Sequence, residues 1–139
     1  MNNLIDTNVI SELGKKTPNA CILEFLRTLP QDSLYLSVIT IGEIVKGIEK
    51  TDDAKKKNRL LSWFAQVRAW FEGHIIYIDE GIMTKWGKFV ANHNRTLPIM
   101  DSFLAATCLH QNLRLVTRNI KDFAGINELS IVNPWDESL

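Results

Sequence analysis

The sequence predicts an α/β domain built on a parallel sheet. Short apolar runs of strand length alternate with longer segments in which apolar residues recur every three or four positions, as in strands joined by helices. The strand-like runs are almost wholly apolar, which is typical of strands covered on both faces. At 139 residues, with 45% hydrophobic and 23% charged residues, the chain is expected to form a single domain over residues 1–139.

Five runs are predicted to be strands because each is short and apolar and is followed by turn or capping residues. The first begins at Asn3 and is ended by Asp6. The other four cover Leu34–Ser37, Ile75–Ile78, Leu113–Thr117 and Leu129–Val132. Right-handed crossovers between parallel strands place the loops that follow them on one rim of the sheet.

The segments between these runs are predicted to be helices. A short helix covers Val9–Leu13 and ends near Gly14, and a second opens at Pro18-Asn19 and is stopped by Pro30. The later helices cover Ser37–Lys50, Ala54–Phe71, Asp79–Asn94 and Met100–Gln111. The inward stripes of the middle four helices are Cys21, Ile22, Phe25, Leu26 and Leu29; Ile41, Ile44, Val45 and Ile48; Leu60, Leu61, Phe64, Val67 and Phe71; and Ile82, Trp86, Phe89 and Val90.

Composition narrows the partners and the location. Sixteen basic residues balance sixteen acidic ones, so the molecule as a whole does not attract nucleic acid. Cys21 and Cys108 stand far apart without metal-ligand spacing, which predicts two buried thiols in a reducing compartment. The chain shows no secretory signal and no apolar run of about 18 residues, so a cytoplasmic location is expected.

Three acidic residues stand out by position. Asp6 ends the first strand, Glu43 lies early in the helix after the second strand, and Asp101 heads a helix that is apolar nearly all round. In a doubly wound sheet these acids and the polar segment Thr117–Asp122 can converge on one rim. Two carboxylates about 5 Å apart repel by roughly 3 kcal/mol at a dielectric of 20. An all-oxygen cluster suits Mg²⁺ or Mn²⁺, and the chemistry it best serves is phosphodiester hydrolysis.

Each acid also has a purely structural explanation. Asp6 can cap a helix beginning near Thr7, Asp101 can be a first-turn acid favoured by the helix dipole, and Asn119 with Asp122 can form another cap. Composition and periodicity leave the choice open for the set.

The role of Glu43 depends on where its helix begins. Thr40-Ile41-Gly42-Glu43 fits a capping box, in which Glu43 only satisfies backbone donors. If Ser37 is the cap instead, Glu43 lies in the second turn and is free to point into the crevice.

Five segments, in this order and spacing, resemble the PIN-domain toxins, the VapC-type proteins of bacterial toxin–antitoxin pairs, and in particular their FitB-like branch. The segments are Leu4–Ile10, Leu36–Glu43, Pro98–Thr107, Val116–Phe123 and Asn133–Trp135. The resemblance covers essentially the whole chain. It implies a three-layer α/β/α sandwich around a central, mainly parallel five-stranded sheet.

The resemblance also implies a Mg²⁺- or Mn²⁺-dependent endoribonuclease, normally a homodimer, that is held inactive by a cognate antitoxin. Its substrate would be structured RNA, such as a transfer or ribosomal RNA, and DNA would be bound only through the antitoxin. The acidic core would be Asp6, Glu43 and Asp101, with Asp6 and Asp101 as metal ligands. Asn119 stands where many relatives have a fourth acid, and Asp122, one helical turn on, can compensate for its missing charge.

Further residues match polar positions of that family. Thr7, Asn8 and Thr117 would orient water or support the metal ligands. The basic residues expected to contact RNA phosphates are Lys46, Lys50, Lys55, Lys56, Lys57 and Arg59, although a solvated helix face explains them equally simply.

Three rival interpretations remain. A phosphoaspartate enzyme is disfavoured because Asn8 stands where a second Asp is needed, and Ser or Cys nucleophile chemistry lacks a motif around any of the three histidines. A catalytically weak PIN-like module that only binds protein is the third alternative.

The tryptophans Trp63, Trp70 and Trp86 can serve an interface or the core, and the core is the default for large aromatic side chains.

Overall fold

A five-stranded sheet forms the centre of the molecule, and all its neighbouring strands are parallel. The computed structural model describes residues 1–136, so residues 137–139 of the predicted domain lie outside the described range. The strands are β1 (Asn3–Ile5), β2 (Leu34–Ser37), β3 (Ile75–Ile76), β4 (Arg114–Val116) and β5 (Ile131–Val132). Their order across the sheet is β3-β2-β1-β4-β5, which confirms the predicted parallel class.

The outer strands are shorter than predicted. In the register of the sheet, Ser37 at the end of β2 pairs with Ile76. The chain after β2 turns directly into a helix at Val38, so Tyr77 has no strand beside it and is exposed. β3 therefore ends at Ile76, two residues before the predicted end at Ile78, because β2, its only neighbour in the sheet, has already ended.

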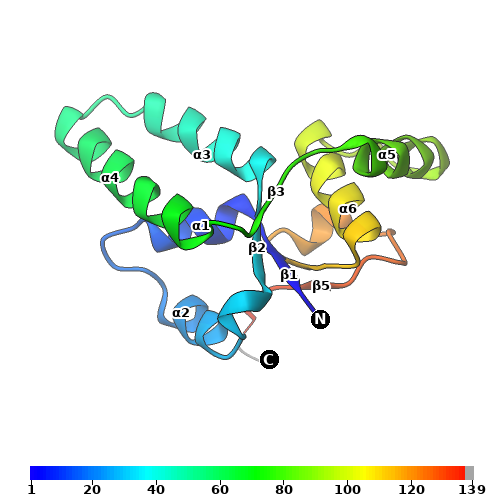
Figure 1. Ribbon diagram of the computed structural model, residues 1–139, viewed down its shortest axis with the longest axis horizontal. Coiled ribbons are helices and arrows are strands. Elements are labelled where there is room, and N and C mark those ends of the chain that lie inside the picture. The colour runs from blue at the N-terminus through cyan, green and yellow to red at the C-terminus, as the bar shows by residue number, and fades with distance from the viewer. Residues whose placement is uncertain (137–139) are drawn as a thin grey trace.

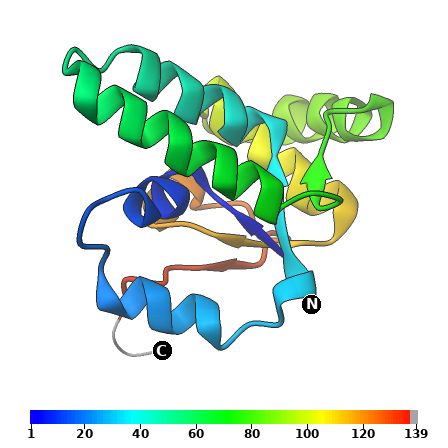
Figure 2. The ribbon, with the colours of Figure 1, turned by 60° about the vertical axis from the view of Figure 1, so that its left-hand side comes forward.

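Helices cover both faces of the sheet (Figures 1 and 2). The helices are α1 (Thr7–Leu13), α2 (Ala20–Arg27), α3 (Val38–Glu49), α4 (Ala54–Trp70), α5 (Glu80–Asn92) and α6 (Ile99–Gln111), with short 3-10 helices η1 (Gln31–Ser33) and η2 (Ile120–Phe123). Side chains of α1 to α4 build one hydrophobic core and those of α5 and α6 build the other. The predicted α/β/α sandwich is confirmed.

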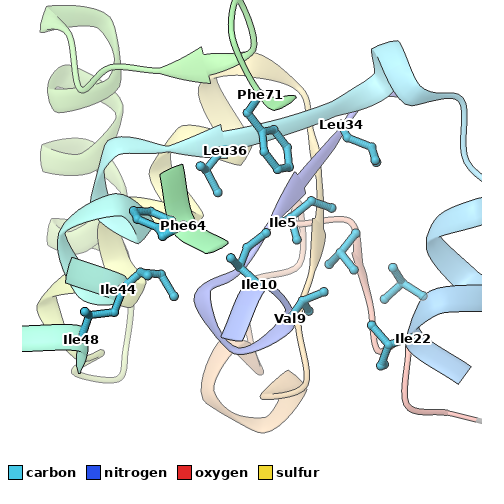
Figure 3. Packing of buried hydrophobic residues seen from close by; sticks show 12 residues of the cluster. Ile5, Val9, Ile10, Ile22, Leu34, Leu36, Ile44, Ile48, Phe64 and Phe71 are labelled. Atoms are coloured by element: carbon cyan, nitrogen blue, oxygen red, sulfur yellow. The ribbon is translucent and has the colours of Figure 1, made fainter. Parts of the chain in front are cut away.

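The central strand serves both cores through its alternating side chains. Ile5 packs into the core beneath α1 to α4, which Figure 3 shows, whereas Leu4 packs into the core beneath α5 and α6. Burial of each such aliphatic side chain stabilises the fold by about 2 kcal/mol. This double anchoring fixes the end of β1, where the candidate site begins.

Five of the helices begin at a side chain that caps them. The oxygens of Asp6, Asn19, Ser37, Asp53 and Asp79 each accept a hydrogen bond from a backbone N–H in the first turn of the following helix. The α1 helix consequently starts at Thr7, two residues before the predicted Val9. The α3 helix starts after Ser37, which decides between the two predicted caps.

The buried stripes of the helices are narrower than predicted. Four residues placed in those stripes are exposed, and each is the immediate neighbour of a residue that is buried or packed against a core. They are Cys21, Val45, Leu61 and Val90. Successive helical residues are about 100° apart, so adjacent positions do not share the stripe. Trp70 is also 49% exposed, which contradicts its default assignment to the core.

The second thiol, Cys108, is buried as predicted. None of the helices in residues 1–136 is long and apolar enough to cross a membrane.

Candidate active site

The candidate site lies where the order of the strands reverses. The chain passes from β1 to β2 along one face and reaches β4 only after α5 and α6 on the other face. The ends of β1 and β4 are therefore neighbours whose connections diverge, and in parallel α/β sheets ligands bind at such a point. Asp6 follows β1 and Thr117 follows β4.

Asp6 is buried and held by three donors. Its Oδ1 accepts the Thr7 backbone N–H at 2.6 Å. Its Oδ2 accepts the Thr117 hydroxyl at 2.7 Å and the Asn8 side-chain amide at 3.3 Å. The capping interpretation and the site interpretation of Asp6 therefore describe the same carboxylate. Burial raises its pKa, and these hydrogen bonds act in the opposite direction.

Glu43 faces the same pocket because Ser37 caps α3. The Ser37 hydroxyl accepts the Ile39 N–H at 3.0 Å, so Glu43 lies in the second turn and takes no part in a capping box. Its Oε1 instead accepts the Thr7 hydroxyl at 2.6 Å. Since the backbone N–H of Thr7 binds Asp6, one residue orients two of the three predicted acids.

Asp101 lies in the first turn of α6 and approaches the other acids from the opposite face of the sheet. Its pKa is raised to about 6, first by partial burial and then by the negative charges of Asp6, Asp122 and Glu43. No donor among the described residues binds its carboxylate. The predicted convergence is therefore supported by the effect of three neighbouring acids on the pKa of Asp101, in addition to the effect of burial.

The segment after β4 joins this network mainly through its backbone. The N–H of Asn119 donates to the Thr117 hydroxyl at 3.1 Å, and the N–H of Arg118 donates to the Asn8 side-chain oxygen at 3.2 Å. The Asn119 side chain makes no capping hydrogen bond, so the predicted cap with Asp122 does not form. Asp122 acts on the site through its charge.

Comparison with protein families identifies the fold. The PIN-domain family model matches residues 4–129. The chain belongs to the PIN-domain family.

Two known proteins and two solved structures resemble this PIN domain over nearly its full length. Toxin FitB of Neisseria gonorrhoeae is 30% identical over 138 residues, which are 96% of this chain and 99% of FitB. The solved structure of FitAcB from the same organism has a TM-score of 0.86 at 31% identity, with 96% and 98% of the two chains covered. VapC ribonuclease Y4jK of Sinorhizobium fredii is 28% identical over 140 residues, covering 96% and 97%. A toxin–antitoxin complex from Klebsiella pneumoniae has a TM-score of 0.71 at 28% identity, covering 97% and 99%.

The donor set of this PIN domain fits a divalent cation. Every side-chain atom that could bind a metal in the pocket is an oxygen of a carboxylate, hydroxyl or amide, as Mg²⁺ and Mn²⁺ prefer. Burial first, and then the negative charges of Asp6, Asp122 and Glu43, raise the pKa of Asp101, and a cation would offset both effects. Among residues 1–136, no group of three or more His, Cys, Asp or Glu side chains is arranged so that it could hold a metal ion. The chemistry of these donors suits such a cation, and the assignment of Asp6 and Asp101 as its ligands stays a prediction.

A groove of about 890 Å³ leads away from the pocket between α1, α3 and α4. Glu43 lies among its lining residues, and three of the six basic residues predicted to contact RNA also line it, namely Lys55, Lys56 and Arg59. The structure thus places half of the predicted basic patch along one surface that includes an acid of the site.

The other three basic residues lie elsewhere. Lys57 forms an ion pair with Glu49 at 3.0 Å. Lys46 and Lys50 are exposed near the end of α3 and do not line the groove. The patch drawn from the sequence therefore divides into groove residues and ordinary surface residues.

Sequence reasoning did not connect two residues with the site: it considered Thr40 only as a possible helix cap and gave Arg95 no role. Thr40 is fully buried, with its hydroxyl 3.1 Å from that of Thr7. Thr40 precedes Glu43 by three positions, and residues three apart on a helix are neighbours on its surface. This spacing could have indicated that Thr40 lies near the site. Arg95 donates through Nη2 to the backbone oxygens of Lys121 at 3.1 Å and Asp122 at 2.6 Å. Nothing in the sequence pattern indicates a contact of that kind, because its acceptors are carbonyls.

Proposed function

We propose that the chain acts as one PIN domain over residues 1–139 and is a metal-dependent endoribonuclease toxin, using Mg²⁺ or Mn²⁺, that cleaves structured RNA. The observation that carries the proposal is the grouping of three acids from different elements: Thr7 binds both Asp6 and Glu43, and the charges of these two act on Asp101. Carboxylates gathered without basic partners favour a cation and a phosphodiester substrate. The printed names of FitB, a toxin, and Y4jK, a VapC ribonuclease, support the same activity.

The residues of the pocket have distinct roles in this proposal. Asp6 and Asp101 hold the cation, which when bound polarises the phosphodiester and lowers the pKa of a water molecule. Thr117 and Asn8 keep the Asp6 carboxylate in one orientation. Glu43, whose Oε1 is occupied by the Thr7 hydroxyl, uses Oε2 to accept a proton from the attacking water. Asn119 and Asp122 complete the rim of the site, and Asp122 adds negative charge.

The proposed substrate is a transfer or ribosomal RNA cut at an exposed single-stranded loop, because unpaired bases are accessible to sequence readout. In this proposal the enzyme acts in the cytoplasm, where those RNAs are found. Lys55, Lys56 and Arg59 line the groove beside Glu43 and are the best-placed members of the proposed phosphate-binding patch. Lys46, Lys50 and Lys57 are its outlying members.

The proposed protein partners are a cognate antitoxin and a second copy of the chain. The Klebsiella pneumoniae match is itself a toxin–antitoxin complex, and DNA is reached only through the antitoxin. Exposed apolar side chains at Trp70, Val90 and Met100 provide surface for such contacts.

Inducible expression in bacteria tests the nuclease proposal. Wild-type protein should arrest growth and produce RNA fragments, whereas Asp6→Ala and Asp101→Ala should do neither. Asp52→Ala is the matched control, because Asp52 is exposed and makes no polar contact among the described residues. It should arrest growth like the wild type. Equal arrest by all four proteins would overturn the mechanism.

A further inference from the structure

The groove beside the site has two walls that are far apart in the sequence. One wall is the end of α1 and the following turn, with Gly14 and Lys16. The other is the first turns of α4, with Lys55, Lys56 and Arg59. The α3 helix, with Glu43 at one end, forms the floor between them, and Figures 1 and 2 show the three helices side by side.

The walls are held together by direct contacts. Arg59 donates through Nη1 to the carbonyl of Gly14 at 3.0 Å. A Cβ at Gly14 would come within 2.9 Å of the Trp63 ring, so α1 and α4 meet closely there. The groove is therefore a fixed feature of the fold and does not depend on mobile surface side chains.

Apart from Glu43 beside the site, the charged groups of the groove that have no ion-pair partner or capping role among residues 1–136 are positive. Lys16, Lys55 and Lys56 have no acidic partner among residues 1–136. The one acid on the α4 wall, Asp53, is occupied as the helix cap, accepting the N–H groups of Lys55 and Lys56 at 3.0 and 3.3 Å. A chain of low net charge thus concentrates unpaired cations on both walls of one groove.

The floor of the groove is open at Gly47. A Cβ built on Gly47 meets no atom within 4 Å, although this residue lines the groove in the last turn of α3. A ligand can therefore approach the helix backbone without displacing a side chain. The same space allows a large side chain to be introduced without disturbing the fold.

We infer that this groove carries the RNA strand away from the cleavage site, with Lys16 on one wall and Lys55 and Lys56 on the other contacting successive phosphates. This inference rests on the proposed nuclease function and adds the path of the substrate. Unpaired cations on both sides of an open floor match a single-stranded phosphate backbone. Lys16 was absent from the sequence-based patch, and Lys57, which pairs with Glu49, lies outside the path.

A steric block provides the first test. Gly47→Trp fills the groove, and Gly87→Trp is the matched control, because Gly87 is an exposed glycine on α5 whose Cβ also meets nothing within 4 Å. Binding is measured in the Asp101→Asn background by fluorescence anisotropy of a labelled single-stranded RNA of about 12 nucleotides. Gly47→Trp should raise the Kd by about tenfold. Gly47→Ala and Gly87→Trp should bind like the parent, and all should keep its Tm.

Charge reversal provides the second test. Lys55→Glu with Lys56→Glu should reduce the salt slope of RNA binding by about 1.4, the value for two lost phosphate contacts on a single strand. Lys85→Glu with Lys88→Glu on α5 changes the net charge equally and should leave the slope unchanged. Equal effects of the two pairs would overturn the groove as the RNA path.

The outcomes separate this inference from the function on which it rests. If wild-type protein binds RNA but cleaves none, the nuclease proposal fails and the Gly47 comparison still decides the path. If wild-type protein cleaves RNA and Gly47→Trp binds and cleaves equally well, only the path is wrong. Loss of antitoxin binding by Gly47→Trp, with RNA binding intact, would assign the groove to a protein partner and overturn the inference.

Discussion

Two aspartates of the site, one just after β1 and one at the start of α6, lie in different environments. Asp6, after β1, is 4% exposed and surrounded by donors from Thr7, Asn8 and Thr117. Asp101, in the first turn of α6, is half-buried, has no such donor among the described residues, and experiences the charges of the other acids. The fold has thus fixed one carboxylate by hydrogen bonds and left the other to be stabilised by something that binds. In the proposed mechanism, Asp6 positions the site and Asp101 makes it responsive to a cation.

The largest expected effect is therefore on metal-linked stability. Mn²⁺ at about a hundred times its Kd should stabilise the wild type by about 2.7 kcal/mol, because it relieves the repulsion at Asp101. Asp101→Asn should lose this gain, and Asp52→Asn should keep it. Chemical denaturation with and without Mn²⁺ measures the difference. A wild type indifferent to Mn²⁺ would favour the protein-binding module over the nuclease.

A smaller effect is expected from removing the fixed carboxylate. Asp6→Ala should destabilise the fold by about 2 kcal/mol, because it removes a helix cap and leaves the buried Thr117 hydroxyl without its acceptor. Asp53→Ala removes an exposed cap on α4 and should cost about 1 kcal/mol. Urea denaturation compares the two variants. Equal losses would mean that Asp6 is no more than a helix cap.

The smallest expected effect is on the pH dependence of the free energy of unfolding, measured without metal. The pKa of folded Asp101, about 6, lies above its usual value of 3.8, so the folded state binds this proton more tightly than the unfolded chain. The resulting stability is complete below pH 3.8 and is lost as the pH rises through about 6. Because water screens a half-buried carboxylate, the loss should be about 1 kcal/mol.

Asp101→Asn removes this dependence and leaves every other titrating group in place. We expect Asp101→Asn to become more stable relative to the wild type as the pH rises from 4 to 7. Unfolding of both proteins is measured in the presence of a metal chelator. Parallel stability curves would show that the charge of Asp101 is not strained in the folded protein.

The same contrast explains what the sequence could predict. Asp6 was identifiable because a buried strand ends in a charged residue, a local signal. Glu43 was ambiguous because both Ser37 and Thr40 are good caps, and only the packing of α3 against the sheet chose between them. Asp101 was recognisable as the single acid at the head of an apolar helix. Its distance from the other acids depended on two crossovers that no local pattern specifies.

The errors share a physical cause. Periodicity locates the centre of a buried stripe but not its width, so Leu61 and Val45 were placed inside although they lie beside it. The basic patch was assembled from sequence neighbours, so Lys57 was included and Lys16 was missed. A groove brings together residues from separate helices, and charge runs along the chain do not reveal which members share it.

The hydrogen bond between Thr117 and Asp6 joins residues 111 positions apart, and it has a consequence during synthesis. The first strand leaves the ribosome before its partner β4, and Thr117, which orients the Asp6 carboxylate, follows 111 positions later. Contacts of such long range form late and slowly. Under the proposed function, the site on a nascent copy therefore cannot assemble before β4 has emerged, which gives an inhibitor time to meet it.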